Sequence, residues 1–314
     1  MRSALTSRGG LLRLFGTLLA LALMVYLLSQ QGWVEISAAI GRIQLWRFAA
    51  ALGLMLISRF SVAGRWHVLL RSGGVKASGA QSLRITFAGL FASNFLPTTI
   101  GGDVARMGGA LQMGFDAAVS AASLIVDRLV GLFGMLLAVP LGLQNLTSEN
   151  FQALHAFPPA LLAFQSGWLN KLLRRLDSLR LRLLKALKLW ISQPAALLTS
   201  LGFTLAHMAC LFAAMYILLV GMQEPLPYLT IAGLWSFVYV VTLLPFTINA
   251  LGLQEVSITY AFNHLGGLST ANSLVLALLV RTLFMLASLP GALFLSELLP
   301  GVAKAQPLLR KLDQ

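Results

Sequence analysis

Apolar runs long enough to cross a bilayer recur along the chain, and they constrain its fold more than any other feature. A transmembrane helix needs about 20 predominantly apolar residues, because it rises 1.5 Å per residue through hydrocarbon about 30 Å thick. Besides the full-length candidate spans, two apolar stretches are interrupted or short: one begins near residue 83 and the other covers 251–264. We therefore predict an all-α, polytopic membrane protein of about six to eight transmembrane segments. The full-length candidate spans are 14–28, 45–70, 117–143, 195–220, 229–244 and 271–298.

The composition excludes a soluble globular protein. Hydrophobic residues make up 58% of the 314 residues and charged residues only 11%, whereas soluble domains carry about 25% charged residues. A globule of this size cannot hide that much apolar surface from water. The formal net charge of +13 reflects basic residues in loops and at span ends, where they orient membrane proteins. We expect no nucleic-acid partner.

Cysteine and histidine give no sign of a metal or redox site. Cys210 is the only cysteine, and the histidines at 67, 155, 207 and 264 stand far apart in the sequence. Neither a disulfide framework nor a metal-ligand spacing is present. We expect no cofactor, no metal and no catalytic residues.

The long polar interval at 144–194 predicts the orientation in the membrane. Its segment 168–190 has leucines at spacings of three and four and basic residues mainly on the opposite side, which is typical of a helix lying in the headgroup plane. A solvated helix packed on the membrane domain is the alternative. Because basic loops stay in the cytoplasm, we expect this loop and the basic N-terminus to be cytoplasmic.

We expect the apolar segment 14–28 to remain as a membrane anchor, because no clear signal-peptide cleavage site follows it.

The chain divides into four parts. The parts are a first membrane half at 1–143 with a break near 97–103, the cytoplasmic loop at 144–194, a second membrane half at 195–299 with a break near 245–255, and a polar tail at 300–314.

A weak internal repeat joins the two membrane halves, and it falls on their polar residues. Each copy has a Pro/Gly break, then an acid, a half-length apolar segment and a long span containing an arginine. Asp103 and Arg128 are 25 positions apart, and Glu255 and Arg281 are 26 positions apart. Chance similarity between leucine-rich segments is the alternative explanation. The helix breaks are Pro97 with Gly101 and Gly102 in the first copy, and Pro245 with Gly252 in the second.

Charged residues inside transmembrane spans cost insertion free energy, so each needs a compensating interaction or a function. An Asp or Arg at the centre of a span costs about 2.5–3.5 kcal/mol on the insertion scale, and each Leu returns only about 0.5 kcal/mol. Asp127 and Arg128 are adjacent and point about 100° apart on a helix, so each needs its own partner or a watery cavity. Backbone groups freed at a break are likewise tolerated only inside protein or along a cavity.

Together these residues predict a binding site for an anionic headgroup. Arginine binds phosphate through two parallel hydrogen bonds, and half-helix N-termini offer free N–H groups to anions. The alternative is that the acid–arginine pairs only lock helices together, and both roles can coexist. The predicted headgroup ligands are Arg128, Arg281, Arg106, Gly101 and Gly102, and the predicted gating or arginine-orienting acids are Asp103, Asp127 and Glu255.

Four runs of residues resemble the flippase-like, lysylphosphatidylglycerol-synthase transmembrane family of bacterial and archaeal membrane proteins. Residues 94–106 are similar to its Asn-x-x-Pro…Gly-Gly-Asp-x-x-Arg signature, the most specific of the four. Residues 65–70 resemble its Arg-Trp-x-x-Leu-Leu element, 123–131 its acid-Arg span, and 244–255 its Pro…Asn-Gly-x-Gly-x-Arg-Glu motif. Ala250 and Gln254 depart from that last motif, in which Gly and Arg are usual, so the resemblance implies a less cationic second half-site.

The resemblance implies a lipid translocator of the bacterial cytoplasmic membrane that moves an anionic phospholipid or a lipid-linked glycan between leaflets. In the aminoacyl-lipid branch a soluble transferase domain follows the membrane part, whereas this chain ends shortly after its last span, so we expect no enzyme activity. Membrane lipids are then the partners. Two alternatives stay open: an intramembrane lipid-modifying transferase using Asp103 or Asp127, and a scaffold that recruits a cytoplasmic glycosyltransferase or lipid synthase through 168–190.

Overall fold

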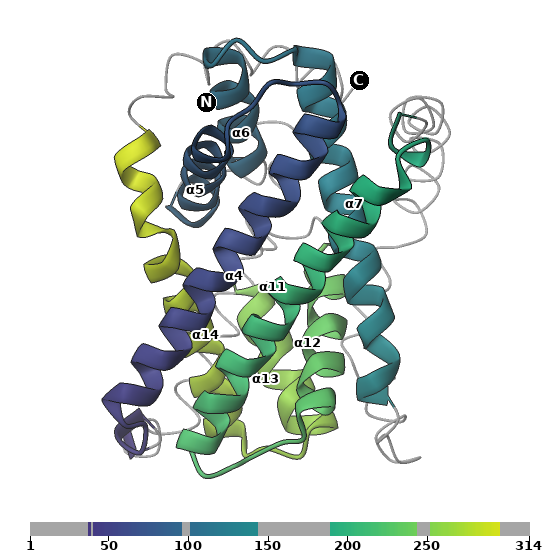
Figure 1. The fold of residues 1–314 in the computed structure, drawn as a ribbon. Helices are drawn as coiled ribbons and strands as arrows, with labels where there is room; N and C mark the ends of the chain where they lie inside the picture. Colours follow the sequence, from purple (N-terminus) through teal and green to yellow (C-terminus); the bar gives the residue numbers. More distant parts are fainter. Residues whose placement is uncertain (1–36, 39, 96–100, 144–188, 244–251, 296–314) are drawn as a thin grey trace, which may run out of the picture.

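A computed structural model describes residues 37–38, 40–95, 101–143, 189–243 and 252–295, and most of these residues are helical (Figure 1). The all-α prediction is confirmed, since no strand occurs within these ranges. The expected anchor at 14–28, the segment 168–188, the tail at 300–314 and both break prolines, Pro97 and Pro245, lie outside the described residues. The helices are α4 (Leu45–Ser72), α5 (Gly79–Phe95), α6 (Gly101–Gln112), α7 (Ala117–Leu143), α11 (Pro194–Gly221), α12 (Tyr228–Thr242), α13 (Leu253–Tyr260) with the π-turn Ala261–Leu265, and α14 (Thr270–Ser288) with the 3-10 turn Leu289–Gly291.

Four of these helices are long and apolar enough to cross a membrane, which confirms a polytopic membrane protein. They are Leu45–Ser72, Ala117–Leu141, Pro194–Gly221 and Thr270–Leu295. The expected span at 229–244 forms α12, which has only 15 residues and is about 22 Å long at 1.5 Å per residue. Helical conformation is disfavoured immediately before a proline, and α12 accordingly ends shortly before Pro245.

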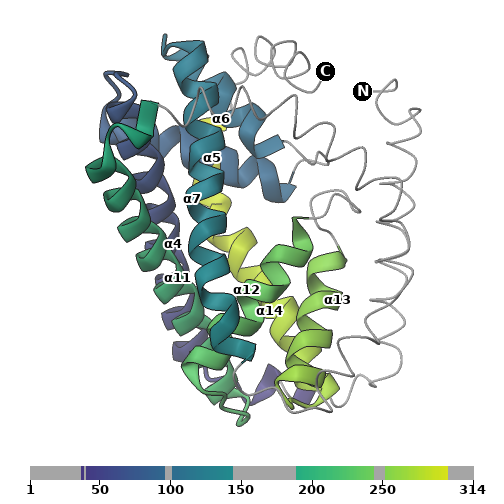
Figure 2. The same cartoon turned by 90° about the vertical axis from the view of Figure 1, so that its right-hand side faces the viewer.

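The order of helices repeats, with α4 to α7 matched by α11 to α14. Each set starts with a helix of 28 residues, continues with two short helices, and closes with a long apolar helix. The short pair α5–α6 lies toward one end of the molecule, and α12–α13 lies toward the opposite end, in both views (Figures 1 and 2). The repeat in the sequence therefore coincides with two sets of helices whose short pairs approach from opposite ends, as in inverted-repeat transporters.

The two sets interlock rather than lying apart. Helix α4 packs along α11, α12 packs on α7, and α5 packs on α14 and the 3-10 turn that follows it. The first of the two short helices in each set, α5 or α12, thus contacts the long last helix of the other set. The largest apolar core lies at this junction and includes Met55, Met135, Met215, Trp235 and Leu276.

One close contact between the sets depends on a glycine. A Cβ on Gly291 would overlap the backbone carbonyl of Phe87 on α5, and a backbone atom cannot move aside as a flexible side chain can. Only a residue without a side chain allows α5 to lie this close to the 3-10 turn.

We expect Gly291→Ala to lower the free energy of unfolding by about 1–3 kcal/mol, as overpacking typically does. Gly53→Ala is the matched control, because a Cβ there meets nothing within 4 Å and replacing a helical glycine by alanine stabilises by up to about 1 kcal/mol. Thermal unfolding of the two purified variants should show shifts of opposite sign. A Gly291→Ala variant as stable as wild type would contradict the close contact.

Candidate functional site

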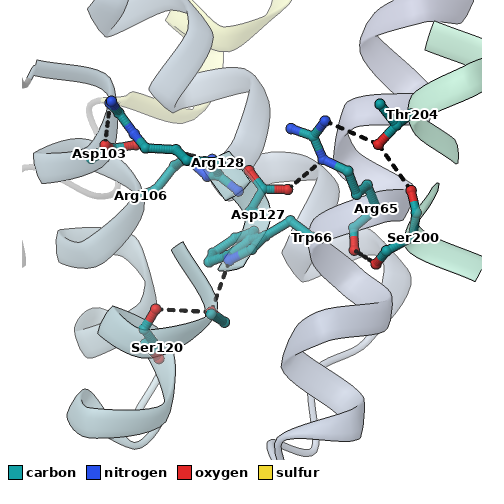
Figure 3. Close-up of polar contacts among 10 residues, drawn as sticks. Arg65, Trp66, Asp103, Arg106, Ser120, Asp127, Arg128, Ser200 and Thr204 are labelled. Atoms are coloured by element: carbon teal, nitrogen blue, oxygen red, sulfur yellow. Dashed lines mark hydrogen bonds and ion pairs between the residues drawn. The ribbon is translucent and has the colours of Figure 1, made fainter. Parts of the chain in front are cut away.

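The centre of the polar site is the carboxylate of Asp127 on α7, which is only 1% exposed. Its two oxygens accept from two arginines on different helices (Figure 3). Arg65 on α4 donates from Nε to Oδ1 at 2.6 Å, and Arg106 on α6 donates from Nη1 to Oδ2 at 3.0 Å. One buried carboxylate therefore ties together α4, α6 and α7.

Further contacts hold the two guanidinium groups in place. Arg65 also donates from Nη1 to the hydroxyl of Thr204 on α11 at 3.3 Å. The guanidinium of Arg106 lies over the ring of Trp66, 4.4 Å from its centroid, and the indole Nε1 of Trp66 donates to the hydroxyl of Ser123 at 3.0 Å. A cation over an indole face is attracted by the ring quadrupole, so Trp66 partly replaces the water that burial removes from Arg106.

The charges continue outward from Asp127 in an alternating series, which we call the charge chain: Arg65, Asp127, Arg106, Asp103 and Arg128. Arg106 Nη1 lies 4.0 Å from Asp103 Oδ1, and the other oxygen of Asp103 pairs with Arg128. The buried end is Arg65, whereas the side chain of Arg128 is 61% exposed. Three guanidinium groups and two carboxylates leave this chain with one positive charge in excess.

The prediction that Asp127 and Arg128 need separate partners agrees with this geometry. Asp127 turns inward to Arg65 and Arg106, and Arg128 turns outward to Asp103. Adjacent residues on one helix thus occupy opposite environments, because they point about 100° apart.

The second set of helices carries the equivalent pair. Glu255 on α13 accepts from Arg281 on α14 and, through its other oxygen, from the backbone N–H of Gly252 at 2.9 Å. Gly252 is the N-cap residue just before α13 and has φ +76°, a left-handed conformation that favours glycine. Glu255 therefore both caps its half-helix and holds its arginine.

One glycine of the first break, Gly102, has a packing role. Gly101 and Gly102 are buried at the start of α6. A Cβ on Gly102 would overlap Ser93 and approach the carbonyl of Gly89 to 2.9 Å, so this glycine lets α6 lie against α5. A headgroup role for Gly101 and Gly102 stays a prediction.

Sequence reasoning missed Arg65 as the main partner of Asp127. The signal was present, because Arg65 lies inside an apolar span and the same insertion cost applies to it. Asp127 is 62 positions away from Arg65 in the sequence, and nothing in the sequence indicates which helices face each other. Among the described residues, no three His, Cys, Asp or Glu side chains lie close enough to hold a metal ion.

Comparison with known protein families identifies the family of the chain. The model of the lysylphosphatidylglycerol synthase TM region matches residues 13–291. The chain belongs to this family. No match is found among curated proteins. Family membership and the four apolar helices together identify a multi-pass membrane protein of lipid metabolism or translocation.

We expect Asp127→Asn to destabilise the protein strongly. Removing one partner of a buried ion pair costs about 3–5 kcal/mol, and here two arginines would lose their carboxylate. Arg128→Gln, one residue further on, should cost less than about 1 kcal/mol, as is typical of exposed pairs. Thermal unfolding in detergent measures both, and equal losses would contradict the difference in burial between these neighbours.

Proposed function

We propose that this protein moves a lipid with an anionic headgroup between the leaflets of the bilayer. The lipid is an anionic phospholipid or a polyprenyl-phosphate-linked glycan. The observation that carries the proposal is the charge chain, which runs from the buried Arg65 to the exposed Arg128 and keeps an excess positive charge.

The exposed end of the charge chain suits a phosphate. A guanidinium has five N–H donors, so Arg128 keeps donors for a ligand while it pairs with Asp103. Its planar fork matches two phosphate oxygens at once. A pair that served only to lock helices would have no need of a guanidinium that is 61% exposed.

The position of Asp103 allows Arg128 to exchange partners. Asp103 lies between Arg128 and Arg106, at 4.0 Å from the latter. When a phosphate draws Arg128 away, Asp103 keeps a cation beside it in Arg106. The exchange therefore leaves no carboxylate unpaired in a region where unpaired charge is costly.

The pair of Glu255 and Arg281 gives the second set of helices a comparable site. Arg281 is on a membrane-length helix and its side chain is 16% exposed. Because α5–α6 and α12–α13 lie toward opposite ends of the molecule (Figure 2), the two arginine sites are suited to serve opposite leaflets. The sequence has no Walker motif, so a gradient, mass action or a partner transferase supplies the direction.

The orientation forms part of the proposal. We place the chain in the bacterial cytoplasmic membrane with the N-terminus and the loop 144–194 in the cytoplasm. The support is the concentration of Lys and Arg in these segments, since short basic loops are retained on the cytoplasmic side.

The test is lipid movement in vesicles reconstituted with the purified protein and a trace of headgroup-labelled phosphatidylglycerol. The fraction of label that an impermeant quencher reaches reports transfer between leaflets. We expect Arg128→Gln and Arg281→Gln each to slow transfer about tenfold or more, because each loses the two-pronged phosphate contact.

Arg71→Gln is the matched control. It makes the same change in charge, and Arg71 is exposed in the last turn of α4. It should transfer lipid at the wild-type rate. Transfer that is equally fast in wild type, Arg128→Gln and Arg281→Gln would refute the proposed site. Chemical conversion of the labelled lipid, detected by mass spectrometry, would instead indicate a lipid-modifying enzyme.

A further inference from the structure

Arg59 at the middle of α4 differs from the arginines of the site. Arg65, Arg106, Arg128 and Arg281 each pair with a carboxylate. Within the described ranges no carboxylate pairs with Arg59, although this residue is only 8% exposed. Its guanidinium lies over the ring of Phe284, 4.5 Å from the centroid, and its Nε has no acceptor.

An arginine in this position remains charged. Guanidinium groups stay protonated in proteins, and a buried charge without a partner is strongly destabilising. A ring face compensates only part of the lost hydration. An uncompensated cation in the middle of a membrane-length helix therefore indicates a ligand of opposite charge.

Arg59 lines a cavity of about 190 Å³ between the two sets of helices. The polar lining comes from four different helices, and the described lining includes no Asp or Glu. These polar residues are Arg59 on α4, His207 on α11, Tyr239 and Thr242 on α12, and Gln254 on α13.

The unsatisfied groups beside this cavity are hydrogen-bond donors. Besides Arg59 Nε, neither the side-chain Nε2 of Gln254 nor the indole Nε1 of Trp235, which also lines the cavity, has an acceptor. Gln254 is only 9% exposed. His207 Nδ1 is engaged by the hydroxyl of Ser58 at 2.6 Å, which leaves the ring's Nε2 as its second hydrogen-bonding atom. Buried donors without acceptors are rare, and three of them on residues of one cavity call for a ligand rich in acceptors.

We propose that this cavity binds one phosphate-type group, held by Arg59 and Gln254, at the junction of the two sets of helices. The volume corresponds to roughly six waters at about 30 Å³ each, which suits a phosphate with a little water. It is below the roughly 300 Å³ of the smallest ordinary ligand pockets, so acyl chains stay outside. This inference rests on the proposed function: the group is the headgroup phosphate of the translocated lipid, held between the sites at Arg128 and Arg281.

The test is the thermal unfolding of the full-length protein in non-ionic detergent with three probes. They are dioctanoyl phosphatidylglycerol, dioctanoylglycerol, which has the same chains without phosphate, and inorganic phosphate. We expect the phosphatidylglycerol to raise the midpoint of the wild type by about 2–4 °C, as saturating ligands do, and dioctanoylglycerol to leave it unchanged. An equal rise with inorganic phosphate would overturn the assignment to a lipid.

Two variants of α4 with the same change in charge locate the effect. Arg59→Met should give a clearly smaller rise with phosphatidylglycerol, because only the sites at Arg128 and Arg281 remain, and Arg71→Met should keep the full rise, because Arg71 is exposed at the end of the same helix. Without lipid, Arg59→Met should unfold at a higher temperature than wild type, because apolar replacements of buried charges are often stabilising. An arginine with a purely structural role would give a lower midpoint instead.

Thr242→Phe keeps Arg59 and fills the cavity, so it tests whether the cavity binds the phosphate group even if Arg59→Met does not fold. It should also reduce the rise with phosphatidylglycerol. A rise as large as that of the wild type in either Arg59→Met or Thr242→Phe would overturn the proposal.

Lipid transfer by the same variants separates this inference from the proposed function. Stabilisation by phosphatidylglycerol that depends on Arg59, in a wild type that transfers no lipid, would support the cavity as a phosphate site and refute translocation. Transfer at the wild-type rate by Arg59→Met would leave translocation standing and overturn the cavity as a site on the lipid's path.

Discussion

The architecture of the first membrane half depends on one carboxylate shared by two arginines inside the membrane domain. Ionised groups are costly in a medium of low dielectric constant unless each has a partner. Asp127 meets this condition for Arg65 and Arg106 together, one at each oxygen. Because the three residues come from α4, α6 and α7, their pairing fixes the short helix α6 against two long ones and sets the position of Asp103 and Arg128.

The distribution of charge is uneven between the two sets of helices, and this has a functional consequence. The pair of Glu255 and Arg281 is neutral, whereas the charge chain has one excess positive charge and Arg59 adds a second. Gln254 occupies a position where the family resemblance leads one to expect arginine, and it lines the same cavity as Arg59. The cation of this cavity is therefore supplied by α4, and the surplus of donors over acceptors favours an anionic ligand.

The interlocked packing of the two sets explains why a polar cavity can exist in a membrane domain. Helix α12 lies on α7 and α5 lies on α14, so both sets contribute to one apolar core. The cavity at Arg59 is lined by helices of both sets. Polar groups inside a membrane domain are tolerated where protein surrounds them or where they line a cavity.

The sequence by itself determined the class of fold, the positions of most described helices and the offsets between acids and arginines. Apolar runs and Pro/Gly breaks act locally, so α4, α7 and α11 begin and end within a few residues of their expected limits. The pairs Asp103–Arg128 and Glu255–Arg281 follow from a repeated spacing. Only the tertiary structure decided that Arg65 faces Asp127 and that Arg59 faces a cavity whose described lining has no carboxylate. Both arginines lie on one apolar helix, and their partners depend on which neighbouring helix each side of α4 meets, which periodicity alone does not encode.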